Sequence, residues 1–376
     1  MIYLDNAATT HPEPEVIEAV AAAMASGTGN ASAIHRAGVQ ASLLVERARV
    51  TIAARLGADP AGLLFTSGGT EANNLAILGV AQAGGRARGH LLCSAIEHPS
   101  VRQPLEQLAR QGFDLEILPV DSTGRLAPDT LHHALRPDTV LVSVIHGSNE
   151  LGTVQDAASI AAICAEARVP MHLDACQSYT RVPLDLGAVQ ADLVSINAHK
   201  IHGPQGVGAL WVRPGTALDP VVHGGGQERG LRPGTLNTAG IAGFAAAVAL
   251  ATPARTAQVT ALRAHLVAGL RERLPWARIH GPREGTLPHV LSVAFPGAMG
   301  KDLFMALNRR GFLVSLGSAC SAGSTAPSAV LTAAGVSPAL ARATLRISPS
   351  HHTTRADLEA LLDALVELTQ PGAAPA

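Results

Sequence analysis

Short apolar runs alternate with longer amphipathic segments from about residue 14 to residue 250. The runs are bounded by turn residues and occupy positions 63–66, 90–94, 115–118, 140–145, 169–173, 193–196 and 208–212. Several of them are apolar throughout, which is expected of strands that helices cover on both faces. Segments of helical length lie between them, for example at 71–83, 101–111 and 157–167. The alternation predicts a large α/β domain over residues 14–250, built on a mainly parallel seven-stranded sheet.

The pattern changes near residues 252–255, where Pro253 interrupts the alternation. A long helical pattern, two short strand-like runs and a last helical pattern follow, at 256–274, 291–295, 313–315 and 355–368. This mixture predicts a smaller α+β domain made of residues 1–13 and 251–376. Ligands of mainly parallel sheets bind at the carboxyl ends of the strands, and the motifs described next fall at such ends.

Composition and charge narrow the classes of partner. Of the 376 residues 47% are apolar and 15% charged, which is typical of a globular protein. The formal net charge is −1 and no block of Lys or Arg occurs, which argues against nucleic acid or a membrane surface as a partner. No apolar run of roughly eighteen residues or signal-peptide pattern occurs, so we expect a cytoplasmic protein. The cysteines are too scattered for a disulfide framework, so we expect reduced thiols at Cys93, Cys164, Cys176 and Cys320.

A lysine follows one of the buried runs. Lys200 comes shortly after the run at 193–196, where a lysine is costly unless its amine is used. Schiff-base chemistry uses it, because desolvation lowers the amine pKa. Asp174 ends an earlier strand, and a carboxylate there can pair with a protonated pyridine nitrogen. A surface lysine and a helix-capping aspartate are the alternatives, so the pair favours a pyridoxal 5'-phosphate site without deciding it.

A glycine-rich turn precedes the first of these helices. Gly68, Gly69 and Thr70 follow a strand-like run, and such a turn directs backbone N–H groups at a phosphate at the positive end of the helix. His98 follows the next strand, where it can stack on a cofactor ring or cap the loop. The turn lacks the lysine of a Walker motif and the glycine spacing of a dinucleotide-binding motif, which argues against a nucleotide-binding protein.

Several motifs occur together in one order along the chain. They are residues 3–10, 66–74, 97–98, 149–153, 174–178, 199–204 and 232–237. Taken together they resemble the cysteine desulfurases, which are class V aminotransferase-like enzymes of the pyridoxal-phosphate-dependent transferase fold type I. The resemblance covers nearly the whole chain. It implies pyridoxal 5'-phosphate as cofactor, L-cysteine as substrate and L-alanine as product.

The resemblance assigns residues around the cofactor ring. Lys200 would bind the cofactor covalently and later move protons on the substrate carbon. Asp174 would pair with the pyridine nitrogen, and Gln177 would hydrogen-bond the phenolic oxygen. His98 would stack on the ring and counts with Lys200 among the catalytic residues. Asn149 would lie near the phenolic side and contact the substrate.

The resemblance also assigns the groups that hold the phosphate and the substrate carboxylate. Gly69, Thr70 and His199 would hold the phosphate, and Thr235 would reach it from the second subunit of a homodimer. Arg346 would grip the substrate carboxylate, a task that suits a bidentate guanidinium. A surface ion pair is the alternative role for this arginine.

Some positions depart from the family's pattern. Asn197 is expected to contact the phosphate, and it stands where the family usually has Ser or Thr. Ser148 replaces a usual asparagine, and His11 replaces a usual proline or threonine. None of these departures touches Lys200 or Cys320, on which the implied chemistry depends.

One thiol lies in a segment of small residues. Cys320 is flanked by Ser, Ala and Gly within about residues 315–328, and such residues favour a mobile, exposed segment. From this pattern alone, an idle surface cysteine is at least as good an explanation. The resemblance implies that Cys320 attacks the substrate sulfur and carries it as a persulfide, with a transient role as an iron–sulfur ligand left open. No resident metal is expected.

The sequence leaves the sulfur acceptor open. Candidates are an iron–sulfur scaffold, a tRNA-thiolation protein, or a protein of thiamine or molybdopterin synthesis. Because the chain ends soon after its last predicted helix, we expect it to lack the C-terminal segment with which some members dock a scaffold. Selenocysteine lysis or transamination on the same fold is the nearest alternative, and neither obviously needs Cys320. A non-catalytic scaffold is disfavoured because the expected catalytic residues are present.

Overall fold

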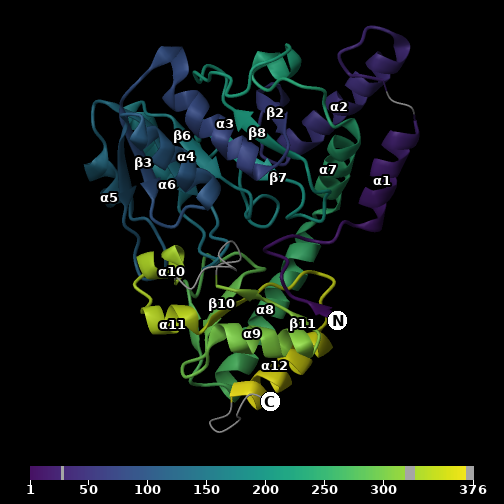
Figure 1. The fold of residues 1–376 in the computed structure, drawn as a ribbon. Coiled ribbons are helices and arrows are strands. Elements are labelled where there is room, and N and C mark those ends of the chain that lie inside the picture. The colour runs from purple at the N-terminus through teal and green to yellow at the C-terminus, as the bar shows by residue number, and fades with distance from the viewer. Residues whose placement is uncertain (27–28, 318–326, 370–376) are drawn as a thin grey trace.

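A seven-stranded sheet forms one layer of the molecule (Figure 1). The computed structural model describes residues 1–26, 29–317 and 327–369. Its strands, in the spatial order β2-β8-β7-β6-β5-β3-β4, are β2 (Leu63–Thr66), β3 (His90–Ser94), β4 (Asp114–Leu118), β5 (Thr139–Ile145), β6 (Met171–Asp174), β7 (Leu193–Asn197) and β8 (Gly208–Val212). The pairs from β4 across to β7 are parallel, and β8 is antiparallel to both of its neighbours. The carboxyl ends of all these strands except β8 therefore lie at one edge.

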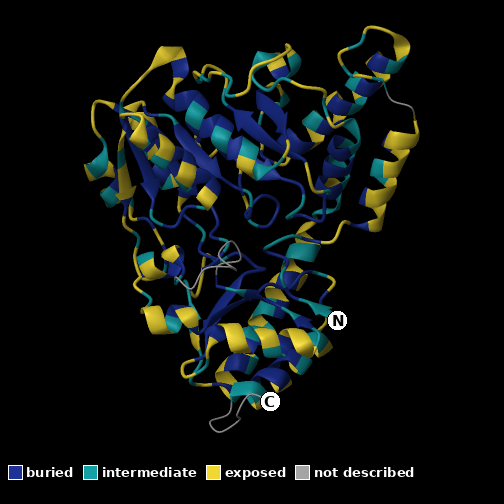
Figure 2. Cartoon of the chain, viewed as in Figure 1, coloured by how far each residue is buried: buried dark blue, intermediate teal, exposed yellow. Residues whose placement is uncertain are grey.

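Helices cover both faces of this sheet. Successive residues of a strand point to opposite sides, so Leu63 and Phe65 of β2 join one hydrophobic core and Leu64 joins another. Figure 2 shows the inner strands of this sheet as buried, dark blue ribbons, whereas the edge strand β4 is mostly exposed. The helices that surround the sheet are α1 (Pro14–Ala25), α2 (Arg36–Ala54), α3 (Gly69–Ala81), α4 (Pro99–Arg110), α5 (Pro128–Ala134), α6 (Ala157–Ala167) and α7 (Thr238–Leu250). Burial on both faces explains why the inner strands are largely apolar.

A second layer has its own sheet and its own core. The antiparallel strands lie in the order β12-β13-β10-β9, and they are β9 (Arg278–His280), β10 (Leu291–Ala294), β12 (Ser315–Leu316) and β13 (Thr344–Ile347). The helices of this layer are α8 (Pro253–Arg273), α9 (Gly300–Arg309), α10 (Ala329–Ala333), α11 (Pro338–Arg342) and α12 (Arg355–Thr369). Leu266, Phe295 and Leu361 are fully buried in its core.

The N-terminal segment connects the two layers. It begins in the second layer, where β1 (Ile2–Tyr3) pairs in parallel with β11 (Phe312–Leu313). It then reaches the large sheet, because the backbone N–H of Thr10 donates to the carbonyl oxygen of His199 at 2.9 Å. The segment therefore passes the carboxyl edge of β7 before α1 begins (Figure 1).

The structure confirms the α/β fold class and the mainly parallel sheet. Every predicted strand of the large sheet is present, with ends shifted by one or two residues. The predicted strand at 313–315 is wrong in detail, because β11 ends at Leu313 and β12 begins at Ser315 in a different sheet. Short 3-10 helices occur at η1 (Pro60–Gly62), η2 (Ala83–Gly85) and η3 (Gln227–Gly230). The boundaries at 14 and 250 stay a prediction, and no described helix is long and apolar enough to cross a membrane.

Candidate active site

The carboxyl edge of the large sheet gathers most of the residues that the sequence singled out. Asp174 is the last residue of β6, and Lys200 follows the end of β7. Gly69 begins α3 directly after β2, and His98 precedes α4 after β3. We call this set of strand ends, with the residues they carry, the cofactor edge. Parallel strands place these ends side by side, as predicted.

Asp174 is held by neutral N–H donors at the cofactor edge. It is 3% exposed, and its Oδ2 accepts from the side-chain amide of Asn73 at 2.9 Å. Its Oδ1 accepts from the backbone N–H of Cys176 at 3.0 Å. Asn73 also donates to Ser100 Oγ at 2.8 Å, and Ser100 lies 2.7 Å from His98 Nδ1. One buried network therefore joins the expected pyridine partner to the expected stacking residue.

His98 caps a helix. Its Nδ1 accepts from the backbone N–H of Ser100 at 3.1 Å, which makes it the N-cap of α4. Burial lowers the pKa of His98; the charge of Asp174 opposes this shift, and that of Lys200 adds to it. The ring is therefore neutral near pH 7 and carries its proton on Nε2. The capping role proposed from the sequence is confirmed, and the stacking role stays a prediction.

The start of α3 suits a phosphate group. Its N-cap residue, Gly68, provides no side-chain hydrogen bond, and its φ of 155° lies in a region that favours glycine. A Cβ on Gly69 would lie 2.4 Å from Cys176 Sγ, so a larger residue does not fit there. Uncapped N–H groups at the positive end of a helix bind anions well. Thr70 is exposed in the first turn of this helix.

The other residues expected to contact the phosphate differ in their burial. Asn197 is 3% exposed, and its Oδ1 accepts from the backbone N–H of Lys200 at 3.3 Å. His199 Nδ1 lies 3.1 Å from Thr9 Oγ1, and burial, followed by the charge of Lys200, lowers its pKa to about 4. Thr235 is exposed between η3 and α7, and its assignment to a neighbouring subunit's site stays a prediction.

Lys200 and Gln177 meet at one backbone oxygen. Lys200 Nζ donates to the carbonyl oxygen of Ala7 at 2.5 Å and to that of Ala8 at 2.9 Å. The Gln177 amide donates to the same oxygen of Ala7 at 2.7 Å. The expected covalent anchor of the cofactor and the expected partner of its phenolic oxygen therefore meet at one backbone oxygen. This acceptor, the carbonyl oxygen of Ala7, belongs to the N-terminal segment.

Sequence reasoning missed the residues that orient this pair. His289 Nε2 lies 3.0 Å from Gln177 Oε1, and burial holds the pKa of His289 well below its usual value. Arg181 donates to the Lys200 carbonyl oxygen at 2.6 Å. Asn73 was part of a motif but received no role. A buried polar residue inside a helix was the available signal for Asn73, because such residues are rare without a partner.

Arg346 lies across from this edge, on the second layer. It is 1% exposed on β13, and its Nη2 pairs with Asp5 Oδ1 at 2.7 Å. Its Nη1 donates to the carbonyl oxygen of Asn149 at 3.1 Å, and its buried Nε has no hydrogen-bond partner among the described residues. The ion pair is therefore buried and not at the surface. An unpartnered guanidinium donor fits a carboxylate ligand.

Cys320 lies outside the described residues, in the gap at 318–326. The residues on either side of the gap are both close to Arg346. On one side Ser315 of β12 is the register partner of Arg346. On the other side Ser328 Oγ donates to Glu150 Oε2 at 2.5 Å, next to Asn149. We call Arg346, Asp5, Asn149, Glu150 and Ser328 the substrate end of the site.

Glu150 has an unusual electrostatic position in the substrate end. Burial raises the pKa of Glu150 to about 7, although the hydrogen bond from Ser328 and the charge of Arg346 lower it. The group is therefore partly protonated near neutral pH. No sequence pattern indicates this, because the burial of Glu150 arises from contacts between the two layers, such as that with Ser328.

Comparison with known proteins assigns the family. A family model described as Aminotransferase class-V matches residues 2–361. A protein of Dictyoglomus turgidum named cysteine desulfurase IscS is 39% identical over 372 residues, which cover 98% of this chain and 94% of that protein. The chain belongs to the cysteine desulfurases of the class V aminotransferases. The family depends on pyridoxal 5'-phosphate.

Solved structures of desulfurase relatives have the same fold. A structure titled NIFS-like protein is 34% identical, with a TM-score of 0.91 and coverage of 98% of each chain. A structure titled SspA in complex with cysteine is 35% identical, with a TM-score of 0.84 and coverage of 94% of this chain and 100% of that one. The family assigned to this desulfurase-like chain from its motifs is therefore confirmed, together with its fold and its cofactor.

Proposed function

We propose that this chain takes sulfur from L-cysteine, releases L-alanine and carries the sulfur on Cys320 as a persulfide. The observation that carries the proposal is the arrangement of groups at the two halves of the site. Lys200 and Gln177 converge on the Ala7 oxygen. The residues that flank the Cys320 segment lie against Arg346 and beside Asn149.

The residues of the cofactor edge fit pyridoxal 5'-phosphate. The uncapped start of α3 would receive the phosphate, and buried Asp174 would receive the protonated ring nitrogen. Gln177 would donate its amide to the phenolic oxygen, and Lys200 would provide the amine that anchors the group. When bound, the cofactor supplies an electron sink that acidifies the hydrogen on the substrate α-carbon.

The substrate end would bind and orient L-cysteine. Arg346 would grip the carboxylate, for which its pairing with Asp5 must loosen or be shared. The unpartnered Nε of Arg346 offers a donor for this purpose. Lys200 Nζ would take the α-proton and later return a proton to the product. The hydrogen bond from Arg346 Nη1 to the carbonyl oxygen of Asn149 would keep the guanidinium oriented while Asp5 gives way, which favours one substrate orientation.

The sulfur step is balanced without an outside oxidant. The thiolate of Cys320 attacks the substrate sulfur, the carbon–sulfur bond of the substrate breaks, and a sulfur–sulfur bond forms. The substrate β-carbon takes up a proton, so that one thiol and one cysteine give one persulfide and one alanine. The described thiols suit this role poorly, since burial raises the pKa of Cys164 to about 12.

The test is release of alanine and sulfide from L-cysteine in the presence of a reductant. We expect Cys320→Ser to retain the visible absorbance of bound cofactor and to release no sulfide above background. Cys164→Ala is the matched control, and its activity should be that of the parent. Equal activity of parent and Cys320→Ser would overturn the role of Cys320 and favour a lyase that acts directly on the substrate.

We also propose a homodimer as the working form. Exposed apolar side chains lie on α1 and α2, two helices that both pack against α7: Ile17, Met24, Val39, Leu43 and Val50. Burial of such residues against a second copy would remove apolar surface from water. The exposed Thr235 would then serve the neighbouring site. Sedimentation analysis checks this, and a monomer at micromolar concentration would contradict it.

The sulfur would pass from Cys320 to an acceptor protein. An iron–sulfur scaffold or a tRNA-thiolation protein fits this role, since either needs activated sulfur. Incubation with radiolabelled cysteine and each acceptor tests the choice. Labelled sulfur that appears on the acceptor only when Cys320 is present supports transfer. Labelled sulfur that stays on the enzyme in the presence of either acceptor contradicts it.

A further inference from the structure

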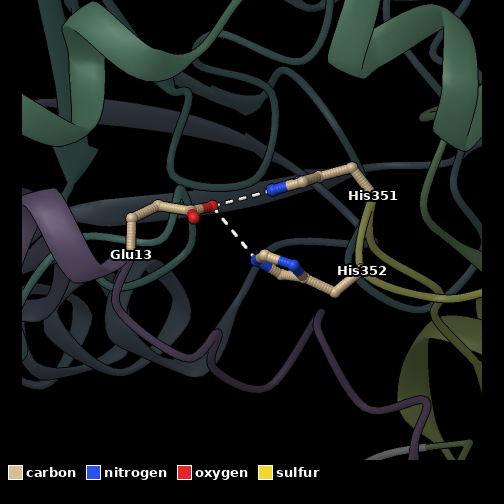
Figure 3. A group of neighbouring side chains, drawn as sticks. All are labelled: Glu13, His351 and His352. Carbon is tan, nitrogen blue, oxygen red and sulfur yellow. Dashed lines mark hydrogen bonds and ion pairs between the residues drawn. The ribbon is translucent and has the colours of Figure 1, made fainter.

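A carboxylate and two histidines meet at the junction of the two layers, beside the loop that follows Lys200. Glu13 precedes α1, and His351 and His352 lie between β13 and α12. Glu13 is only 3% exposed. Figure 3 shows both imidazole rings with a nitrogen directed at the Glu13 carboxylate. Residues far apart in the sequence thus bring one oxygen and two nitrogens together.

The spacing of these atoms suits a metal ion. Glu13 Oε1 lies 2.7 Å from His351 Nε2 and 3.2 Å from His352 Nε2. The three candidate ligand atoms all lie within 4.8 Å of one another. Ligands of a tetrahedral zinc ion at about 2.0–2.1 Å are separated by roughly 3.3 Å. A small outward movement of the side chains would therefore accommodate the ion.

A third histidine packs against the group. The side chain of His351 is 10% exposed, and its Nε2 faces Glu13 Oε1. His202 packs against both rings, and its buried Nε2 has no hydrogen-bond partner among the described residues. An unsatisfied buried nitrogen is rare and indicates a missing partner.

The donor types suit a transition metal. Imidazole nitrogens and a carboxylate oxygen are common ligands of zinc. Two nitrogens and a carboxylate favour zinc-like transition metals over magnesium or calcium.

One neighbouring cation competes for the carboxylate. Arg255 Nη1 lies 3.1 Å from Glu13 Oε1, and the Arg255 side chain is 32% exposed. It is therefore able to turn toward solvent or toward the second carboxylate oxygen when an ion arrives. His352 and His202 also line a cavity of about 370 Å³, so the His352 side of the group faces open space.

We infer that Glu13, His351 and His352 form a binding site for a zinc-like divalent transition metal, with a fourth position open to water. The ion would fasten the segment before α1 to the loop after β13. It would therefore hold the large sheet and the second layer together. The site is separate from the proposed desulfurase chemistry and does not depend on it.

The test is titration of tag-free, cofactor-loaded protein with Co²⁺, monitored by visible d–d absorption. We expect His352→Ala to weaken binding at least about 100-fold, because even outer-shell partners of metal ligands contribute roughly 10- to 100-fold. His352 is more than half exposed, so its removal should leave the fold intact. The matched control is His132→Ala, which alters the exposed pair of adjacent histidines on α5.

Two further measurements distinguish this site from a thiol site. Cys320→Ser should keep the same absorption and affinity as the parent. Saturating Zn²⁺ should raise the unfolding midpoint of the parent by roughly 2–4 °C and leave that of His352→Ala unchanged. Undiminished Co²⁺ binding by His352→Ala, an equal loss in His132→Ala, or a loss in Cys320→Ser would each overturn the inference.

Discussion

At the cofactor edge, the partners of Asp174 come from the same large sheet and the helices on it: the amide of Asn73 on α3 and the backbone N–H of Cys176 after β6. At the substrate end, Arg346 on β13 is paired instead with Asp5 and with the carbonyl oxygen of Asn149, which come from other parts of the chain. The first set is assembled within one sheet, and the second only when the two layers meet.

This difference has consequences for rigidity and charge. The cofactor edge carries a buried carboxylate that neutral donors hold in place. The substrate end combines an unpartnered guanidinium Nε with Glu150, whose pKa burial raises to about 7. Preorganisation suits a cofactor that stays bound, whereas unsatisfied and titratable groups suit a substrate that comes and goes. Substitutions in the two regions should therefore have separable effects.

The largest effect is expected from Asp174→Asn. Removing the charge leaves the protonated ring nitrogen without its buried partner, a change that costs about 3–5 kcal/mol for buried ion pairs. That corresponds to a fall in kcat of roughly 160- to 5,000-fold. Steady-state alanine release, with the visible spectrum of the bound cofactor, provides the measurement.

Asp156→Asn is the matched control for this experiment. Asp156 caps α6, is exposed, and should tolerate the amide with activity unchanged. Asp174→Asn with activity within about twofold of the parent would mean that Asp174 only supports the local fold.

A smaller, different effect is expected from Arg346→Lys. An ammonium cannot reproduce the bidentate geometry of a guanidinium, so carboxylate binding should weaken. We expect the KM for L-cysteine to rise roughly 10- to 100-fold, equivalent to about 1.4–2.7 kcal/mol, while the cofactor spectrum is unchanged. Arg263→Lys on α8 is the control, since Arg263 donates to the carbonyl oxygen of Val290 in the same layer. Loss of cofactor from Arg346→Lys would contradict the separation of the two regions.

The sequence allowed the cofactor edge to be predicted for a physical reason. Apolar runs with intervening helices determine a parallel sheet, and such a sheet brings Gly69, His98, Asp174 and Lys200 to one edge. The identities of these residues then indicate the chemistry. A capping role of His98 could also be predicted, because the residue stands directly before a helix.

The contacts between the layers could not be predicted from the sequence in the same way. The pairing of Arg346 with Asp5 joins residues at opposite ends of the chain. No local pattern encodes such a contact, and the same holds for His289 beside Gln177 and for Glu13 beside His351. Their positions follow from how two independently patterned layers pack, which periodicity along the chain does not specify.

The smallest effect on catalysis is expected from Glu150→Gln, and its effect on stability depends on pH. The pKa of Glu150 is raised from 4.5 to about 7, so the folded chain holds a proton that the unfolded chain releases. Stability from this group is therefore complete below about pH 4.5 and is lost as the pH rises toward 7. Glutamine cannot ionise, so the free energy of unfolding of the variant should exceed that of the parent at pH 8, by at most about 3 kcal/mol. Denaturant unfolding at pH 5 and pH 8 measures this difference.

Glu97→Gln provides the matched control within the cofactor edge. Burial raises the pKa of Glu97 to about 8, and this carboxylate accepts from Ser94 and from the backbone N–H of Ile145. Its replacement should also alter the pH dependence of stability. Only Glu150 holds Ser328 beside the segment that contains Cys320, so only Glu150→Gln should also shift the pH profile of sulfide release. Identical pH profiles in the two variants would show that the substrate end and the cofactor edge do not act separately.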